Sequence, residues 1–488
     1  MPGIQRKMKR ARRRRTGDEY ISDDGDFGED LFSELPDEIL ISILSRLTLR
    51  EAAATSVLSQ RWRYLWTYTS RLNFDSVVNK IVRRSHSFAL STAAGRRRRR
   101  RRRKYIKWVH KVLAKYRGGR NLDEFRVCFD LSKRSRSDID KWFEFAMSKN
   151  VKNLEFDFLR CSSQNQDRDP WFVMLSYFQN FYKFPHRILG VREARDPNGM
   201  FVGFKSLKTL SLKSINVSSE AVEYFLSNCP LLERLSVHGS ESLVNLRVAG
   251  PSIMLRHLEI VKCSSIQTIE ICDTNLVSFT YRGERKGDLL PNNMHIENSP
   301  LLVEVLAGVG RLGFAKNMLL KLSSCVHQLQ ILQLTVDHFF PERSRAYLLP
   351  KLRNLKQLKL TVFVGCPENC LLGFVAMLKK CPHLESFVLQ LKWRTQIIPV
   401  AKRYAKALIQ YSHQYLKLVK IVGFNDCSSA CELVMQIIEN AIALEKIIID
   451  TSQGHRRRGP WLKRQLAART RAEQLKSHVP PSLEFIVL

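Results

Sequence analysis

The sequence predicts an α/β protein in which three short helices precede a long, irregular solenoid with a curved parallel sheet and helices on its convex face. Three observations favour this fold class. Residues 31–66 contain three helix-start signals and two apolar faces. From about residue 120 onward, apolar residues recur in the pattern apolar-x-x-apolar-x-apolar, which is typical of the short strands of stacked repeats. The longest segments between these strands show the apolar spacing of helices.

The helical region begins with Pro36 at a first helical position, where the missing N–H group of proline costs nothing. An apolar stripe follows at helical spacing, made of Leu35, Ile39, Leu40, Ile43, Leu44 and Leu47. Thr48 and Glu51 have the spacing of a capping box for a second helix, and Ser59 is placed to cap a third. Three helices this short cannot bury all their Leu and Trp side chains, so we expect another part of the chain or a partner to cover some of them.

The same residues carry a resemblance to a known family. The elements Leu35-Pro36-x-x-Ile39-Leu40-x-x-Ile43-Leu44, Ser56-Val57-Leu58-Ser59 and Arg61-Trp62-Arg63-x-Leu65-Trp66 resemble an F-box of the plant type. The resemblance implies docking on a Skp-type adaptor and, through it, on a cullin–RING scaffold. An ordinary helical hairpin that caps the next domain is the alternative. The residues expected to divide between the adaptor contact and the helical core are Leu35, Pro36, Ile39, Leu40, Ile43, Leu44, Val57, Leu58, Trp62, Leu65 and Trp66.

A repeated triplet organises most of the remaining chain. Its members are Leu122/Phe125/Val127, Val151/Leu154/Phe156, Leu207/Leu210/Leu212, Leu232/Leu235/Val237, Leu255/Leu258/Ile260, Leu276/Phe279/Tyr281, Leu302/Val305/Ala307, Leu329/Leu332/Leu334, Leu355/Leu358/Leu360, Leu384/Phe387/Leu389, Leu416/Val419/Ile421 and Leu444/Ile447/Ile449. The pattern resembles irregular leucine-rich repeats, in which stacking builds the core that a single repeat cannot form. The register between residues 157 and 206 stays open.

Helical return segments are predicted at 219–229, 370–380, 429–440 and 461–476, and residues 104–116 also have apolar residues on one helical face. Residues 427–450 resemble the FBD region that ends many plant F-box/leucine-rich-repeat proteins. The triplet Leu483/Ile486/Leu488 repeats the strand pattern. We expect it to form a strand that caps the open end of the solenoid.

The charge of the chain is unevenly placed. The formal net charge is +34, residues 6–15 contain eight Lys or Arg residues, and Arg96–Arg103 is an unbroken run of eight arginines. Because blocks of like charge repel and stay solvated, we expect both tracts to be disordered. The first tract has the density of a nuclear-localisation patch, made of Lys7, Lys9, Arg10, Arg12, Arg13, Arg14 and Arg15. Weak polyanion binding and the absence of a function are the alternatives for the Arg run.

The sequence offers little support for catalysis or cofactors. Gly308-x-Gly310-x-x-Gly313 has the spacing of a dinucleotide-binding loop, but it lies within the repeats, and a loop between repeats is the better interpretation. The eleven cysteines are scattered without a Cys-x-x-Cys pair, which favours reduced thiols over zinc ligands. We therefore predict a non-enzymatic chain without cofactor or metal.

Length and composition set the domain plan. With 488 residues and 44% apolar content, the chain has room for about two to four folded domains. No run of about 18 apolar residues predicts a membrane span, and the N-terminus lacks the apolar segment of a secretory signal, so we expect no membrane contact and a location in the nucleus, the cytoplasm or both. The predicted segments are a disordered basic and acidic tail at 1–30, the F-box at 31–75, a linker with the Arg run at 76–118, the leucine-rich-repeat domain at 119–454, and a basic tail with a capping helix and strand at 455–488.

These observations lead to one functional hypothesis and one alternative. The resemblance implies a substrate-recognition subunit of an SCF-type (Skp–cullin–F-box) ubiquitin ligase, whose repeat domain binds a target protein that the sequence does not identify. The sequence likewise does not show whether a small molecule binds the repeats. The alternative is a nuclear leucine-rich-repeat scaffold that binds nucleic acid through its Arg tracts.

Overall fold

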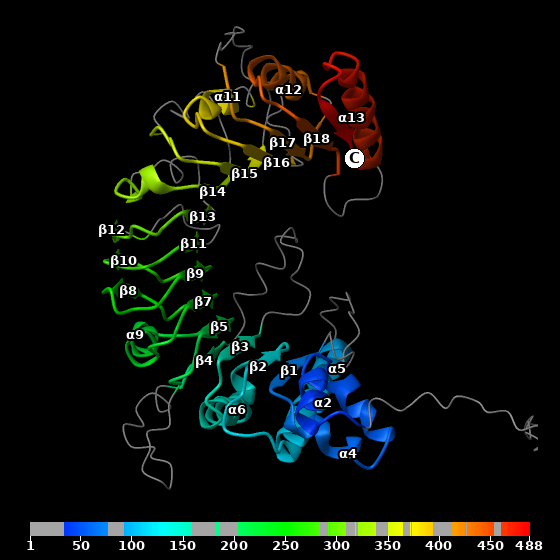
Figure 1. Cartoon of the computed structure of the whole chain (residues 1–488), viewed down its shortest axis with the longest axis vertical. Helices are drawn as coiled ribbons and strands as arrows, with labels where there is room; N and C mark the ends of the chain where they lie inside the picture. Colours follow the sequence, from blue (N-terminus) through cyan, green and yellow to red (C-terminus); the bar gives the residue numbers. More distant parts are fainter. Residues whose placement is uncertain are drawn as a thin grey trace, which may run out of the picture.

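A computed structural model describes most of the chain (Figure 1). The described residues are 34–76, 92–158, 181–185, 204–283, 291, 293–308, 318, 321–337, 350–364, 371, 373–393, 412–425, 427–452 and 460–488, without the side chains of 92–94, 336–337, 376 and 460–463. Within this part of the chain, no helix is both long enough and apolar enough to cross a membrane.

A curved parallel sheet dominates the molecule. In the described residues its 14 strands follow one another in chain order from the N-terminal to the C-terminal end, and Figure 1 shows them along the inner side of an arc. Each strand therefore pairs with the strands of the preceding and following repeats, as expected for stacked repeats. The strands are β1 (Arg71–Asp75), β2 (Glu124–Cys128), β3 (Asn153–Asp157), β5 (Thr209–Lys213), β7 (Arg234–His238), β9 (His257–Val261), β11 (Ser278–Arg282), β13 (Glu304–Gly308), β14 (Ile331–Asp337), β15 (Gln357–Val364), β16 (Ser386–Trp393), β17 (Leu418–Val422), β18 (Lys446–Asp450) and β19 (Glu484–Val487).

The predicted triplets set the register of this sheet. Leu210 of β5 pairs with Leu235 of β7, for example, and Leu212 pairs with Val237. The second and third members of every triplet from Leu122 to Ile449 lie in strands and are buried. Because alternate residues of a strand face the same side, these side chains form one continuous core behind the sheet. The predicted leucine-rich-repeat solenoid is confirmed.

Helices cover parts of the convex side (Figure 1). The predicted return helices are present as α9, α11, α12 and α13, and α6 has no counterpart among the predictions. The helices outside the F-box region are α5 (Thr92–Lys115), α6 (Arg136–Ser148), α9 (Ser219–Asn228), α11 (Gly373–Leu378), α12 (Ser428–Asn440) and α13 (Pro460–Lys476), with single 3-10 turns at η3 (Lys133–Ser135) and η4 (Val326–Gln328).

The middle of the convex side is a second sheet, which corrects the expectation of helices there. Strands β8 (Asn245–Ala249), β10 (Thr268–Cys272) and β12 (Asn293–Glu297) pair in parallel. Their buried residues alternate, as with Ile269 and Ile271 of β10, and this period of two favours strands over helices. A further pair of two-residue strands consists of β4 (Tyr182–Lys183) and β6 (Ile215–Asn216), whereas β3 pairs directly with β5.

Three short helices and two 3-10 turns precede the first strand. They comprise α2 (Asp37–Leu44), α3 (Leu49–Ala54), the 3-10 turn η1 (Thr55–Val57), α4 (Trp62–Leu65) and the 3-10 turn η2 (Trp66–Tyr68). Strand β1 follows η2 almost at once, so the solenoid begins inside the segment predicted as the F-box. Thr69, Leu72 and Phe74 have the triplet spacing, and all three are buried. The sequence did not predict this strand, because a threonine occupies the position that is usually leucine.

The Arg run corrects the prediction of a disordered linker. Arg96–Arg103 forms the N-terminal half of α5, and the C-terminal half buries Tyr105, Val109 and Val112 in the core. Arginine is a good helix former, and the apolar anchor fixes the helix against β1 and β2. Residues 92–115 are therefore an ordered helix that packs against the core of the solenoid.

The C-terminal strand is present, but its register differs from the predicted triplet by one residue. Ile447 of β18 pairs with Phe485 of β19, and Ile449 pairs with Val487. Leu483 and Phe485 are buried, whereas Leu488 is 55% exposed. Both Phe485/Val487 and Ile486/Leu488 have the alternation of a strand. Pairing with β18 places the first pair in register with Ile447 and Ile449.

Sharp corners end several strands. The residues directly after β5, β8, β9, β10 and β12 (Ser214, Gly250, Lys262, Asp273 and Asn298) have positive φ angles. At the corner after β17, Gly423 has φ +77°, and a Cβ atom there would lie 2.2 Å from the backbone oxygen of Leu391. Only glycine fits that corner without displacement of the backbone.

Candidate functional site

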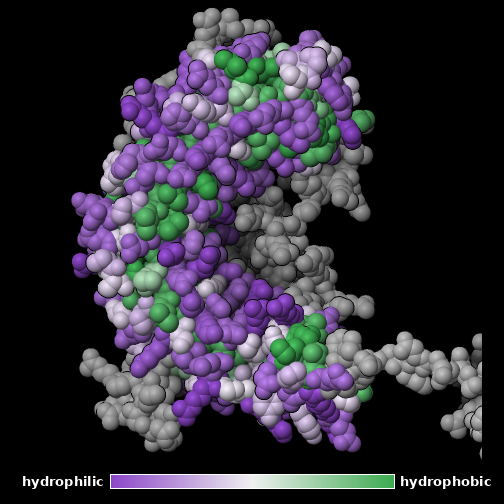
Figure 2. All heavy atoms as spheres, in the orientation of Figure 1, coloured by the Kyte–Doolittle hydropathy of each residue, from purple (hydrophilic) through white to green (hydrophobic). Residues whose placement is uncertain are grey.

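Helix α2 divides its apolar stripe between a core and the surface. Leu40 and Leu44 are buried with Ala52 and Leu65 in a small cluster separate from the main core. Ile39 and Ile43 are 47% and 39% exposed. These two apolar side chains lie one turn apart and form a continuous exposed stripe, and exposed apolar surface of this kind is typical of interaction sites. Figure 2 shows an apolar patch over the part of the molecule where Figure 1 places α2.

Polar contacts fix the geometry of these short helices. The guanidinium of Arg61, just before α4, donates to the carboxylate of Asp37 at the start of α2, with an Nη2–Oδ1 distance of 2.7 Å, and also to the backbone oxygen of Leu35. Thr48 and Glu51 form the predicted capping box. The hydroxyl of Ser59 accepts from the backbone N–H of Trp62 at 3.4 Å. The Arg61 contacts join the starts of α4 and α2, and the other two contacts stabilise the starts of α3 and α4, helices that have no more than eight residues each.

The predicted adaptor residues separate into three groups. Leu40, Leu44 and Leu65 are buried, Leu35, Trp62 and Trp66 are half-buried, and Pro36, Ile39, Ile43, Val57 and Leu58 are exposed. Pro36 precedes α2 as its N-cap rather than standing at the first helical position. Three exposed apolar residues outside the predicted set are Leu47, Tyr64 and Tyr68. Leu47 continues the stripe of α2. Its spacing of four residues from Ile43 is the feature of the sequence that could have placed it among the predicted adaptor residues.

The inner face of the sheet carries a network of charged side chains at its N-terminal end. Arg126 of β2 lies between Asp75 of β1 at 3.7 Å and Glu155 of β3 at 3.0 Å. Lys213 of β5 also contacts Glu155, at 3.1 Å. Partial burial alone would lower the pKa of Lys213, but the carboxylates of Glu155 and Asp157 raise it. The network links neighbouring repeats and gives this end of the concave face alternating charge.

A second polar cluster lies on the next two strands of the sheet, β7 and β9, and its residues were not predicted. His238 of β7 contacts Glu259 of β9 with an Nε2–Oε2 distance of 3.1 Å, and the hydroxyl of Ser236 donates to the same carboxylate at 2.7 Å. The hydrogen bond from His238 is the main reason that the pKa of Glu259 falls to about 2. Ser236 and Glu259 both contact Nε2 of His238, whereas a catalytic triad uses both ring nitrogens. The arrangement suits binding rather than nucleophilic catalysis.

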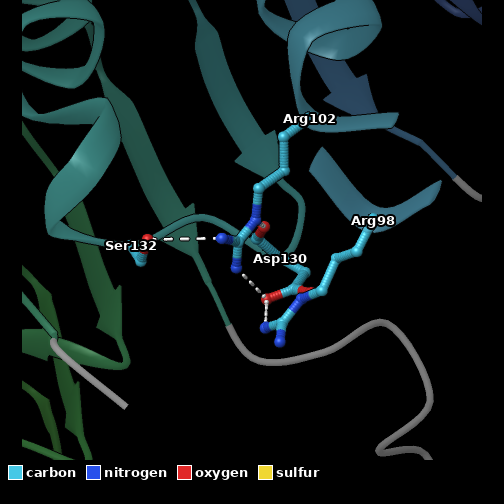
Figure 3. A network of polar contacts seen from close by, with 4 residues as sticks. All are labelled: Arg98, Arg102, Asp130 and Ser132. Carbon is cyan, nitrogen blue, oxygen red and sulfur yellow. Dashed lines mark hydrogen bonds and ion pairs between the residues drawn. The ribbon is translucent and has the colours of Figure 1, made fainter. Parts of the chain in front are cut away.

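The inward arginines of α5 converge on one carboxylate (Figure 3). Arg98 donates to both oxygens of Asp130, at 2.6 and 2.7 Å, and Nη2 of Arg102 donates to Oδ1 at 2.9 Å. Nη1 of Arg102 also reaches the hydroxyl of Ser132 at 3.4 Å. Burial would raise the pKa of Asp130, but these bonds and charges outweigh it and lower the pKa. Two of the eight arginines are therefore docking residues of the helix.

The other predicted sites receive no support from the described geometry. Gly308 ends β13 in register with β14, while Gly310 and Gly313 lie outside the described residues, as do Lys7, Lys9, Arg10 and Arg12–Arg15. Among the described side chains, no group of three or more His, Cys, Asp or Glu residues is placed to hold a metal ion. Six of the eight cysteines in the described part of the chain are buried.

Comparisons with known proteins agree with this geometry. A family model described as the F-box domain matches residues 32–73. A second one, described as the LRR domain of At1g61320/AtMIF1, matches residues 117–477. The first covers the helices with the exposed stripe, and the second covers the solenoid from β2 onward.

Three relatives from Arabidopsis thaliana illustrate the similarity. F-box/FBD/LRR-repeat protein At1g13570 is 30% identical over 230 residues, which cover 47% of this chain and 49% of the relative. F-box/LRR-repeat protein 25 is 31% identical over 240 residues, which cover 48% and 77%. FBD-associated F-box protein At5g38590 is 29% identical over 228 residues, which cover 46% and 49%. The chain spans about half the length of the first and third of these relatives.

The solenoid and the short helices that precede it define a leucine-rich-repeat protein with an N-terminal F-box. The chain belongs to the F-box/LRR-repeat proteins, within the family described by the At1g61320/AtMIF1 LRR domain. The predicted family is confirmed.

Proposed function

We propose that this chain is the non-catalytic substrate-recognition subunit of an SCF-type ubiquitin ligase. The single observation that carries the proposal is the exposed apolar stripe of α2 inside a matched F-box domain. F-box domains generally bind Skp-type adaptors, and repeat domains bind the protein to be modified. Such a receptor needs no active site, because holding the substrate near the conjugating enzyme raises its effective concentration.

The adaptor contact centres on the exposed residues rather than on the buried ones. Ile39, Ile43 and Leu47 offer apolar area that a groove on the adaptor would remove from water, at about 25 cal/mol per Å². Leu40 and Leu44 support this surface from below. The exposed pair Val57 and Leu58 extends the contact to the segment between α3 and α4.

The test is recovery of a purified Skp-type adaptor by the full chain. Ile39→Ser/Ile43→Ser should weaken recovery about tenfold or more, since each lost apolar contact is worth roughly 1 kcal/mol. Leu231→Ser/Met254→Ser is the matched control, because these side chains are 46% and 47% exposed elsewhere on the molecule. Equal recovery by both variants, or no recovery by the unchanged chain, would contradict the proposal.

The concave face of the sheet is the proposed surface for the target protein. It presents polar side chains from neighbouring strands in fixed register, among them Arg126, Glu155, His238 and Glu259. Proximity labelling under proteasome inhibition, with the unchanged chain and with Arg126→Gln/Lys213→Gln, identifies proteins whose recovery depends on this face. A recovered set that is the same for both chains would place target binding elsewhere.

Nuclear import is a separate proposal that rests on the basic residues 7–15. Replacement of Lys7, Lys9, Arg10 and Arg12–Arg15 by Gln in a fluorescent fusion should shift the protein from the nucleus to the cytoplasm. As a control for the loss of cations elsewhere on the surface, Arg469→Gln/Arg471→Gln/Lys476→Gln on α13 should leave the distribution unchanged. An unchanged distribution of the first variant would refute this signal.

A further inference from the structure

The cations of α5 lie on two different faces of the helix. Arg98 and Arg102 face inward and contact Asp130. On the opposite side, five exposed cations recur every three or four residues and form what we call the basic stripe: Arg96, Arg100, Arg103, Lys107 and Lys111. Residues at this spacing lie one above another on a helix, so the basic stripe is a continuous surface.

The length of the basic stripe matches a short stretch of nucleic-acid backbone. From Arg96 to Lys111 it is about 23 Å long at 1.5 Å per residue, which is the span of about six or seven phosphates along one nucleic-acid strand. No acidic residue occurs among the 24 residues of α5. The inward contacts with Asp130 and the burial of Tyr105 and Val109 fix the helix, so the outward cations are pre-organised.

We propose that the basic stripe of α5 binds the phosphate backbone of nucleic acid without reading its sequence. Neither family match includes this helix, since the F-box match ends at residue 73 and the repeat match begins at residue 117. An anionic membrane fits less well, because membrane-surface helices expose large apolar residues opposite their cations, and here Tyr105, Val109 and Val112 are buried in the protein core. An acidic polypeptide offers a lower density of charge than a phosphate backbone.

The test is binding of a fluorescent oligonucleotide of about 20 nucleotides to the full chain at several salt concentrations. Arg100→Gln/Lys107→Gln/Lys111→Gln should weaken binding about tenfold or more at low salt, and it should reduce the slope of log affinity against log salt by about 2 to 3. Circular dichroism and thermal unfolding should be unchanged, because the three side chains are exposed. Arg100→Lys should retain most of the affinity.

The matched control removes three exposed cations from another helix. Arg469→Gln/Arg471→Gln/Lys476→Gln on α13 makes the same change in net charge and leaves the basic stripe intact. Residues 6–15 are unchanged in both variants. A difference in affinity between the two variants therefore reports where the cations were removed. Little loss with this control is the expected result. Equal loss with both variants, no binding by the unchanged chain at low salt, or preferential binding to polyglutamate or phosphatidylserine vesicles through the basic stripe would overturn the proposal.

Discussion

The guanidinium of Arg98 forms a bidentate ion pair with the carboxylate of Asp130, with N–O distances of 2.6 and 2.7 Å. Arg102, one turn further along α5, contacts the same carboxylate. The aspartate follows β2 and holds the N-terminal half of α5 against the second strand of the sheet. The carboxylate of Asp130 compensates the charge of two arginines in the run, so this part of the chain can fold as a helix. The remaining arginines of the run face solvent.

Loss of the Asp130 carboxylate should loosen α5. Asp130→Asn is expected to cost about 1.5–3 kcal/mol of unfolding free energy, the range for hydrogen bonds to charged groups, as measured by urea denaturation. Hydrogen exchange should show faster exchange in α5 before the rest of the solenoid. Asp123→Asn is the control, because its pair with Lys152 is more exposed and exposed pairs contribute less than about 1 kcal/mol.

The same pair gives a pH dependence with a defined sign. Because the folded-state pKa of Asp130 is lowered, its contribution to stability is present above the unfolded-state pKa and is lost as the pH falls through the folded-state pKa. The unchanged chain should therefore lose more stability than Asp130→Asn on acidification below about pH 4. Parallel pH profiles for the two proteins would contradict this role.

The two faces of α2 should respond differently to truncation. Leu44 is 1% exposed in the small helical core, whereas Ile43 is 39% exposed. Leu44→Ala is expected to cost about 2–5 kcal/mol, and Ile43→Ala should change the unfolding free energy by less than about 0.5 kcal/mol. Thermal unfolding with a probe on Trp62 or Trp66 checks both. Similar losses for the two variants would mean that the stripe is covered within the chain.

Glu259 should stay ionised well below the usual range of a glutamate. Its pKa of about 2, lowered from 4.5, means that its stabilisation is complete above about pH 4.5 and is lost as the pH falls toward 2. Titration by carbon NMR with labelled Glu should show this value. His238→Ala should raise the pKa most and Ser236→Ala less, and the reverse order would contradict the assigned cause.

The corner after β17 should reject any side chain. Gly423→Ala combines a positive φ with a clash against Leu391, so it is expected to cost at least about 2 kcal/mol. Gly250→Ala separates the two causes, because φ is +115° there but no atom lies within 4 Å of the added Cβ. Urea denaturation should rank Gly423→Ala as clearly more damaging, and equal losses would assign the effect to φ alone.

The sequence predicts the strands that follow the repeated apolar triplet, but not those that depart from it. Triplets such as Leu207/Leu210/Leu212 were found because burial requires apolar residues at alternate strand positions. Strand β1 was missed because Thr69 replaces the first leucine, and the register of β19 was wrong because Phe485 and Ile486 both fit an apolar pattern. The division of the F-box residues between core and surface was left open, since spacing on a helix does not show which side its neighbours cover.

The sequence by itself determined the repeat register and the capping box of α3, because apolar periodicity and caps act between residues that are close in the chain. Only the tertiary structure decided that the Arg run is helical, that Ile39 and Ile43 face solvent, and that His238 meets Glu259. The ordering of the Arg run depends on the contact of Arg98 with Asp130, 32 positions further along the chain, and the His238–Glu259 pair joins residues 21 positions apart. Such contacts form only when the repeats stack, so the spacing of residues within one helix or strand does not predict them.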